Sequence, residues 1–212
     1  MKIRNLLSGL FALLGMGAAA AGIYLSLHNM NASPVLLVQP EEAKAKVVSV
    51  LDAVCDGDYA QASLGMQGTP DLGVDRAAEG QVGNLIWNAF LDSISYELEG
   101  ECYATDSGIA QNVVIRTLEL NSVTEKLREH SQAMLAQRVE QAEDTSELYD
   151  ENNEYREELV MEVLLEAAKQ ALAEDVRYVT WEIRLNLIYD NGQWWVLPEQ
   201  ELLRAISGGL VK

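Results

Sequence analysis

The sequence predicts an α+β fold in which a curved antiparallel sheet packs against helices, with a helical-pair insertion and an N-terminal transmembrane helix. Apolar residues recur at helical spacing from residue 41 to residue 55, and the spacing changes to every second residue after residue 93. Two separate segments also have the pattern of an antiparallel strand hairpin. Helices followed by hairpins indicate helices packed on one face of an antiparallel sheet.

Length and charge narrow the class of protein. The chain has 212 residues and a formal net charge of −18, so one leader segment and one domain of about 170 residues fit. Nucleic acid is excluded as a partner, because binding it requires Lys and Arg to neutralise phosphates. From Glu140 to Asp175 there are 13 Asp and Glu against only Arg156 and Lys169. We interpret this excess as a solvated helix surface.

The first 27 residues form the leader. Lys2 and Arg4 precede the uncharged run Leu6 to Leu27, which as a helix would span about 33 Å and cross a hydrocarbon core. We therefore expect residues 1–27 to be a membrane anchor, with the membrane contacted through residues 6–27, or a signal segment cleaved near Ala18 to Ala21. The basic start should stay in the cytoplasm. The expected location is the cell membrane, single-pass, with the bulk of the chain extracytoplasmic; a cleaved leader would make the protein secreted.

Residues 28–40 contain two prolines and no periodic pattern, which indicates a linker, and residues 41–212 form the exported α+β cone-like domain. The domain should begin with an amphipathic helix that ends at Gly57. Asp58 should start a short second helix. A third is predicted from Arg76 to Phe90, with Trp87 near the edge of its apolar side.

The first predicted strand follows this third helix. Ile94, Tyr96 and Leu98 alternate with polar residues, the turn lies at 106–108, and the chain returns as a strand that includes Val113 to Leu120.

A helical pair should come next. Residues 122–125, "SVTE", have the form of a capping box, so we expect a helix from Ser122 toward Ala142. A second start at Asp144 should lead into a long helix with a wide apolar stripe that reaches Leu172.

The last hairpin has the strongest local signal. A long alternating strand from Val179 to Tyr189 precedes Asn191-Gly192, which favours a type I′ turn because both residues tolerate positive φ. Trp194 and Trp195 should point to opposite faces of the returning strand, and residues 199–206 should form a closing helix after Pro198.

Three segments carry a resemblance to a known family: "CDGDYAQA", "VVIRTLELNSVT" and "LIYDNGQWWVLPEQELLRAISGG". They look like the nuclear transport factor 2-like superfamily, the ketosteroid-isomerase-like cone fold, and in particular its membrane-anchored or secreted bacterial members of unknown function. The resemblance covers residues 41 to 207. The chain departs from it in the helical pair from Ser122 to Asp175, which is longer than a compact cone has.

The resemblance implies where an enzyme of this fold would carry its chemistry: a carboxylate base and hydrogen-bond donors deep in an apolar cavity. Tyr96 and Tyr103 lie near the first hairpin, but the predicted inward rows carry no Asp, and Glu97, Glu99 and Glu101 alternate to the solvent side. We therefore assign no catalytic or cofactor-binding residue and expect no cofactor.

Metal binding is not expected either. The chain has only His28 and His130, of which we expect His130 on a helix surface, and a zinc site needs more His and Cys. The acidic run from Asp150 lacks the central Gly of a calcium loop.

Cys55 and Cys102 both fall on predicted inward faces, one on the first helix and one on the first strand. In an exported domain they can form a disulfide. The alternative is two buried free thiols, because Cys behaves as a small apolar residue when it is buried.

The first functional hypothesis is a non-enzymatic, membrane-tethered extracytoplasmic binding or assembly domain, whose protein or small-molecule ligand the sequence does not identify. One alternative is a small-molecule enzyme that uses the cone cavity. Another is a regulatory or secretion component that binds protein partners through the acidic helical pair.

Overall fold

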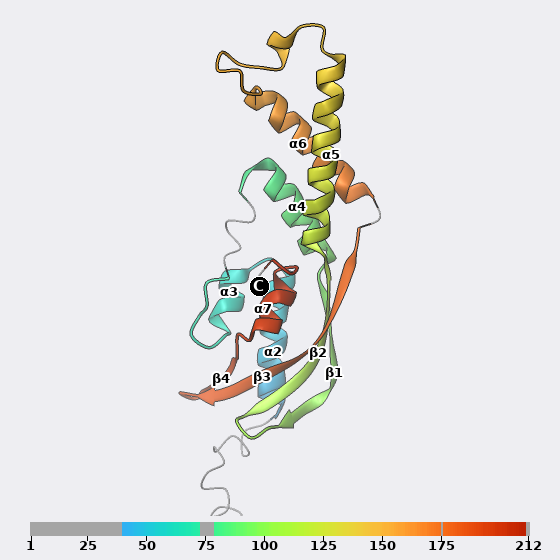
Figure 1. Ribbon diagram of the computed structural model, residues 1–212. Coiled ribbons are helices and arrows are strands. Elements are labelled where there is room, and N and C mark those ends of the chain that lie inside the picture. The colour runs from blue at the N-terminus through green and yellow to red at the C-terminus, as the bar shows by residue number, and fades with distance from the viewer. Residues whose placement is uncertain (1–39, 73–78, 175, 211–212) are drawn as a thin grey trace, which may run out of the picture.

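Four antiparallel strands form one sheet in the order β1-β2-β3-β4, and the sheet curves around a group of helices (Figure 1). This computed structural model describes residues 40–72, 79–174 and 176–210. The strands are β1 (Ser95–Ala104), β2 (Ile109–Leu118), β3 (Tyr178–Asp190) and β4 (Gln193–Val196). The predicted α+β class and antiparallel sheet are confirmed.

The helices divide into two groups. The first group, α2 (Pro40–Cys55), α3 (Tyr59–Leu64) and α7 (Gln200–Ile206), lies on the concave side of the sheet (Figure 1). In the second, α5 (Leu120–Gln141) and α6 (Glu157–Ala173) form a helical hairpin that projects from the sheet, with the short 3₁₀ helix η3 (Thr145–Glu147) near its tip. Between the two groups lies α4 (Gly80–Ser93), which contacts both β2 and α6.

The helix α2 forms where the sequence predicts it. Val47, Val50 and Leu51 recur on one side and are buried, while Glu41 and Glu42 in the first turn favour the positive end of the helix dipole. After α2 the chain turns at Gly57, whose φ is 76°. The side chain of Asp58 then accepts a hydrogen bond from the Gln61 N–H and caps α3.

The core lies between α2, α4, α7 and the concave face of the sheet. Its largest fully buried side chains include Phe90, Leu51, Met66 and Ile115. All the buried residues of the core cluster fall between Ala43 and Ile206. Among the described residues, this core joins α2 at the start to α7 at the end.

An irregularity in β1 surrounds the buried Gln111. The β1–β2 register shifts between Glu99 and Tyr103, and Gly100 has a φ of 67°. The Gln111 amide nitrogen donates to the carbonyl oxygens of Glu99 (3.1 Å) and Asn112 (2.9 Å), so the fully buried amide is satisfied.

The terminal hairpin is confirmed at its turn. Asn191 and Gly192 have φ values of 52° and 84°, and they are the only residues between β3 and β4, as in a type I′ turn. Trp194 is 3% exposed and packs edge-on against Tyr189, whereas Trp195 is half-buried. The two tryptophans differ as predicted for opposite faces of one strand.

Three details of the helix predictions were wrong. The helix expected from Ser122 toward Ala142 is present as α5, but it begins at Leu120, so residues 122–125 lie inside it and do not cap it. The predicted start at Asp144 gives only the single turn η3, and α6 begins at Glu157. Trp87, predicted near the edge of its helix's apolar side, is buried against Phe90 with ring centroids 5.0 Å apart.

Among the residues that the structure describes, no helix is long and apolar enough to cross a membrane. The predicted anchor at residues 6–27 lies outside the described residues, as does the predicted helix start at Arg76.

Candidate functional site

The two cysteines lie near opposite ends of α2. Cys55 is the last residue of α2, while Cys102 on β1 lies near Lys44, in the second turn of the same helix. Eleven residues of helix separate Lys44 from Cys55, or about 16 Å at 1.5 Å per residue. Both cysteines are free thiols. The structure therefore has two free thiols at these positions, and both are half-buried, whereas the free-thiol alternative expected them to be buried.

Both thiols are held in their protonated form. Burial raises the pKa of Cys55, and the nearby carboxylates of Asp52 and Asp56 raise it further. Burial likewise raises the pKa of Cys102, although the Lys44 ammonium group opposes that shift. The Cys102 thiol donates a hydrogen bond to the Gln111 amide oxygen, 3.0 Å away. Neither environment activates a nucleophile.

A Tyr–carboxylate pair links β1 to α2, but it is not buried in an apolar cavity. The Tyr96 hydroxyl donates to an Asp52 carboxylate oxygen at 2.6 Å, and Asp52 is exposed. Burial and this hydrogen bond raise the pKa of Tyr96, because ionising the phenol would place a second negative charge beside the carboxylate. A general base of the ketosteroid-isomerase kind needs a desolvated carboxylate, so we give this pair no catalytic role.

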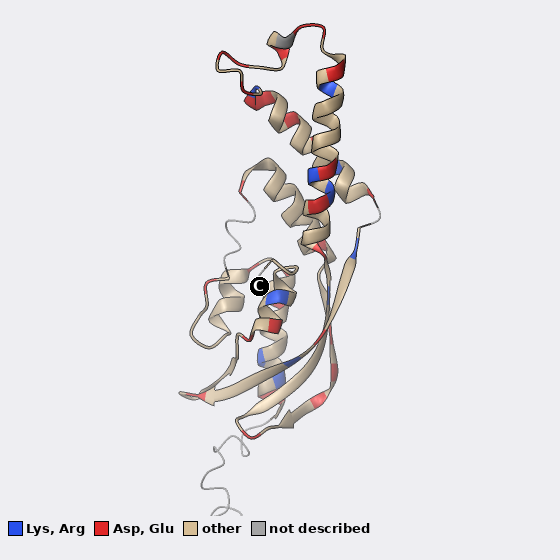
Figure 2. Ribbon diagram, in the orientation of Figure 1, with Lys and Arg blue, Asp and Glu red and all other residues tan. Residues whose placement is uncertain are grey.

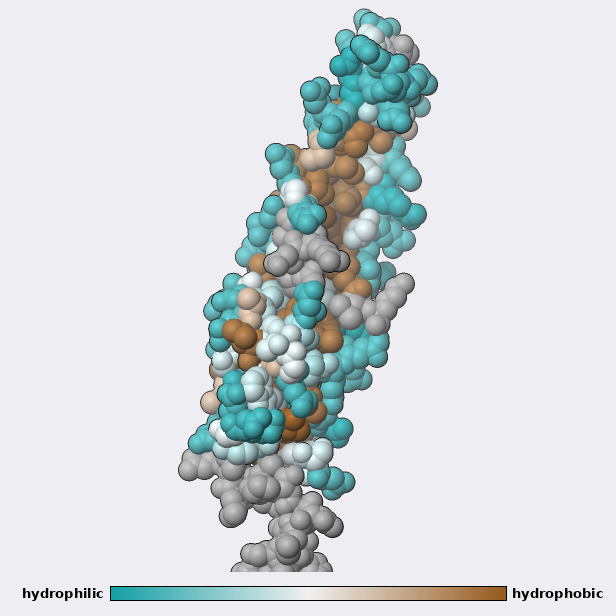
Figure 3. Space-filling view, turned by 90° about the vertical axis from the view of Figure 1, so that its left-hand side faces the viewer, coloured by the Kyte–Doolittle hydropathy of each residue, from teal (hydrophilic) through white to brown (hydrophobic). Residues whose placement is uncertain are grey.

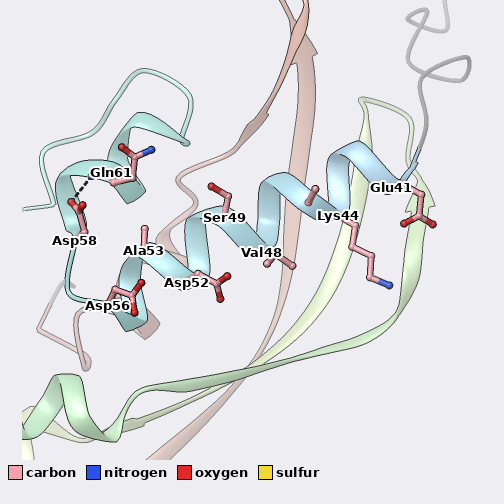
Figure 4. Close-up of a pocket in the computed structure, with 10 residues that line it drawn as sticks. Glu41, Lys44, Val48, Ser49, Asp52, Ala53, Asp56, Asp58 and Gln61 are labelled. Atoms are coloured by element: carbon pink, nitrogen blue, oxygen red, sulfur yellow. Dashed lines mark hydrogen bonds between the residues drawn. The ribbon is translucent and has the colours of Figure 1, made fainter.

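A groove of about 700 Å³ runs along the outer side of α2 and the start of α3 (Figure 4). Glu41 and Lys44 line one end, and the carboxylates of Asp52, Asp56 and Asp58 line the other. Lys44 is paired with Glu101 of β1 at 3.1 Å. The groove is open to solvent and the three aspartates are exposed. It attracts cations in general but lacks the buried polar groups of a selective small-molecule site.

Within the described ranges, no three His, Cys, Asp or Glu side chains gather as a metal site would require. In the acidic run from residue 150, the Asp150 carboxylate accepts hydrogen bonds from the backbone N–H groups of Asn152 (2.8 Å) and Glu154 (2.9 Å). These two hydrogen bonds lower the pKa of the Asp150 carboxyl, and the bond from the Glu154 N–H has the larger effect. The carboxylate therefore shapes the loop at the hairpin tip.

Ion pairs join α5 to α6. Arg138 lies 2.6 Å from Glu162 and 4.0 Å from Glu166, and nearer the base of the hairpin Lys126 and His130 approach Glu174 at 3.4 and 3.0 Å.

His130 was expected at the surface, but only 20% of its side chain is exposed. Its Nε2 atom lies within ion-pair distance of the Glu174 carboxylate. The angles at this contact are not those of a hydrogen bond, and Nε2 makes no other hydrogen bond within the described part of the chain. Burial opposes ionisation of Glu174, but the contacts with His130 and Lys126 outweigh it and lower the pKa of that carboxyl.

The hairpin is strongly acidic, especially near its tip (Figure 2). From Leu120 to Glu174 the sequence has 14 Asp and Glu against 5 Lys and Arg, a net charge of −9. At the tip the rings of Tyr149 and Tyr155 stack with centroids 4.9 Å apart. The acidic surface predicted for this segment is confirmed as exposed.

The apolar side chains of α6 cover more than half of its circumference, so the helix needs neighbours on two sides. Both α5 and α4 contact α6, and its Val163 and Ala167 are fully buried. Val160, Leu164 and Leu165, however, are only half-buried, and Met161 is 39% exposed. These four residues share one side of the helix, away from the side where Arg138 reaches across from α5.

The neighbouring side of α4 is apolar as well. Trp87 and Phe90 of α4 are buried in the core, whereas Val82 and Leu85, nearer the start of the helix, are only half-buried. Figure 3 shows apolar residues in a band over these upper helices, with hydrophilic residues on both sides. The open apolar face is our name for the partly exposed large apolar residues that these two contacting helices carry here: Val82, Leu85, Val160, Met161, Leu164 and Leu165.

The sequence contained a signal for this face. The wide apolar stripe predicted for the second helix of the pair is wider than one partner helix can bury. Locating the uncovered part required the position of α4, which local periodicity does not determine.

Comparisons of the chain with protein families, with characterised proteins and with solved structures found no match.

Proposed function

We propose that this chain is a non-enzymatic binding or assembly domain, tethered to the membrane by residues 6–27 and lying outside the cytoplasm, and that the open apolar face is its binding surface. The observation that carries the proposal is this face itself. Soluble domains rarely leave a contiguous apolar band uncovered unless something binds it.

The projection of the hairpin supports this use. The α5–α6 pair extends away from the sheet and its core (Figure 1), so a partner can reach the face without disturbing the fold. The groove on α2 is a weaker candidate because its lining is open and its charged groups face solvent.

We also propose that this chain is related to the nuclear transport factor 2-like proteins, which have the cone fold. The curved sheet, the helices on its concave side and the terminal hairpin around Asn191-Gly192 support it. The uncharged run at residues 6–27 and its basic start support the tether.

Site-specific photo-crosslinking tests the binding surface. A benzoylphenylalanine residue replaces Met161 in the full chain, produced in cells of the source organism, and the matched control carries it at Gln170, an exposed residue on the polar side of α6. We expect irradiation to give a discrete adduct from position 161 that Leu165→Ser weakens, and none from position 170. Equal adducts from both positions, or none from either, would contradict the proposal.

A further inference from the structure

The open apolar face is shaped for a helix. It lies on two helices that contact each other, α4 and α6, and its residues on α6 are spaced over one and a half turns. Side chains on two such helices form ridges and grooves into which a third helix can pack. An apolar stripe with i, i+3, i+4 and i+7 anchors is the usual form of a peptide that binds such a surface.

The charge beside the face decides which helix can bind. Glu157 and Glu158 occupy the first turn of α6, and Glu79 lies at the start of α4. The tip loop adds further acidic residues, among them Asp150 and Glu151 (Figure 2). A ligand with Lys or Arg flanking its apolar stripe gains Coulomb attraction here, whereas an acidic ligand is repelled.

The same charge argues against two other occupants. A second copy of this chain would bring one hairpin of net charge −9 against another. A membrane surface is disfavoured because the anionic lipids of a bilayer repel an acidic hairpin.

We propose that the open apolar face binds a basic amphipathic helix of another protein. This inference rests on the proposed function and names the partner class of the same surface. Apolar side chains of the bound helix cover Met161, Leu164 and Leu165, and its Lys and Arg residues approach Glu157 and Glu158.

Three designed 18-residue peptides test the partner class. All carry Leu in the same amphipathic pattern, and the polar positions are Lys in the first peptide, Gln in the second and Glu in the third. A fourth peptide has the composition of the first in scrambled order. Fluorescence anisotropy measures their binding to the full chain in nanodiscs of zwitterionic lipid and to residues 40–212, which include the core that joins α2 to α7.

We expect the Lys peptide to bind at least about tenfold more tightly than the Glu and scrambled peptides, and to lose affinity as salt is added. Met161→Ser and Leu165→Ser should each weaken it about tenfold, and Gln170→Ser should leave it unchanged. Circular dichroism confirms that each variant is folded. The peptide series on the unmodified chain provides a test that needs no variant.

Four results would overturn the inference. Equal affinity for the Lys, Gln and Glu peptides would show that charge does not select the partner; a specific crosslink from position 161 would then leave the proposed function intact. Self-association in analytical ultracentrifugation that Met161→Ser abolishes, or binding to vesicles rich in phosphatidylglycerol, would identify a second copy or a membrane as the occupant. Binding to residues 40–212 but not to the full chain would show that the chain's own N-terminal segment covers the face.

Discussion

Trp194 is 3% exposed in the core, while Trp195 is half-buried, with the Lys46 ammonium nitrogen 5.9 Å from its ring centroid. Trp194→Ala should lower the free energy of unfolding by about 3–5 kcal/mol, because it removes a large buried side chain and leaves a cavity. Trp195→Ala should lower it by only about 1 kcal/mol.

Thermal and urea denaturation of residues 40–212 measures both tryptophan changes. Trp195→Ala is the matched control, because it removes the same side chain from the adjacent position. Equal losses from the two variants would contradict the assignment of Trp194 to the core.

Cys55 and Cys102 should both react slowly with a maleimide at pH 7, since burial raises the pKa of each thiol and leaves little thiolate. The folded state holds these protons more tightly than the unfolded state does. The stabilisation from the two partly buried thiols is therefore complete below the usual thiol pKa and is lost as the pH rises through the raised values.

Mass spectrometry of the labelled chain checks the cysteine prediction, with Cys55→Ser and Cys102→Ser to assign each site. The unfolded chain should take up two labels at a rate roughly tenfold or more above that of the folded chain. A chain that accepts no label when unfolded until a reductant is added would instead contain a disulfide.

At the scale of elements, the β3–β4 hairpin depends on its two-residue turn. Gly192 has a φ of 84° and open space around its Cα, so a larger side chain there meets backbone strain and no steric clash. Gly192→Val should therefore cost about 1–2 kcal/mol of stability.

Denaturation of the Gly192→Val variant measures this cost, with Gln193→Val as the control, because Gln193 lies in β4 where a β-branched residue is tolerated. An unchanged midpoint for Gly192→Val would show that the strain of positive φ is relieved by a different turn.

The α5–α6 hairpin shows why helix ends are harder to predict than helix faces. Residues 122–125 have the pattern of a capping box, yet α5 starts at Leu120, which is buried and whose N–H donates to the Gly208 carbonyl at 3.3 Å. A contact with the end of α7 therefore extends the helix beyond its local start signal. The α6 start is displaced in the opposite direction, because residues 148–156 fold back as a loop in which the Arg156 N–H donates to the Leu148 carbonyl at 2.9 Å.

At the scale of the whole molecule, the proposed tether predicts a topology. With residues 6–27 in the membrane and the basic start inside, protease added to spheroplasts should digest the domain. Immunoblotting of the membrane fraction before and after protease measures this, and a cytoplasmic protein serves as the control for intact cells. Full protection would contradict the extracytoplasmic location, and recovery of the chain from the medium would indicate a cleaved leader.

The sequence by itself determined the α+β class, the antiparallel pairing of both hairpins and the type I′ turn at Asn191-Gly192. It also determined that Trp194 and Trp195 point to opposite faces of β4. All of these depend on residues close together in the chain: a period of two for strands, of 3.6 for helices, and positive φ at a turn. The acidity of the helical pair was likewise a property of composition.

Only the tertiary structure decided which apolar residues are covered. Trp87 is buried and Met161 is exposed although both lie on amphipathic helices, because Trp87 packs against Phe90 in the core whereas Met161 lies near the start of α6, toward the tip of the projecting hairpin. Gln111 can be buried because the irregular part of β1 supplies the Glu99 and Gly100 carbonyls, and β2 the Asn112 carbonyl, as partners for its amide. Cys55 and Cys102 are separate thiols because Cys55 is the last residue of α2, whereas Cys102 lies on β1 near the other end of that helix. Burial depends on which elements meet in space, and the contacts that determine it join residues far apart in the sequence.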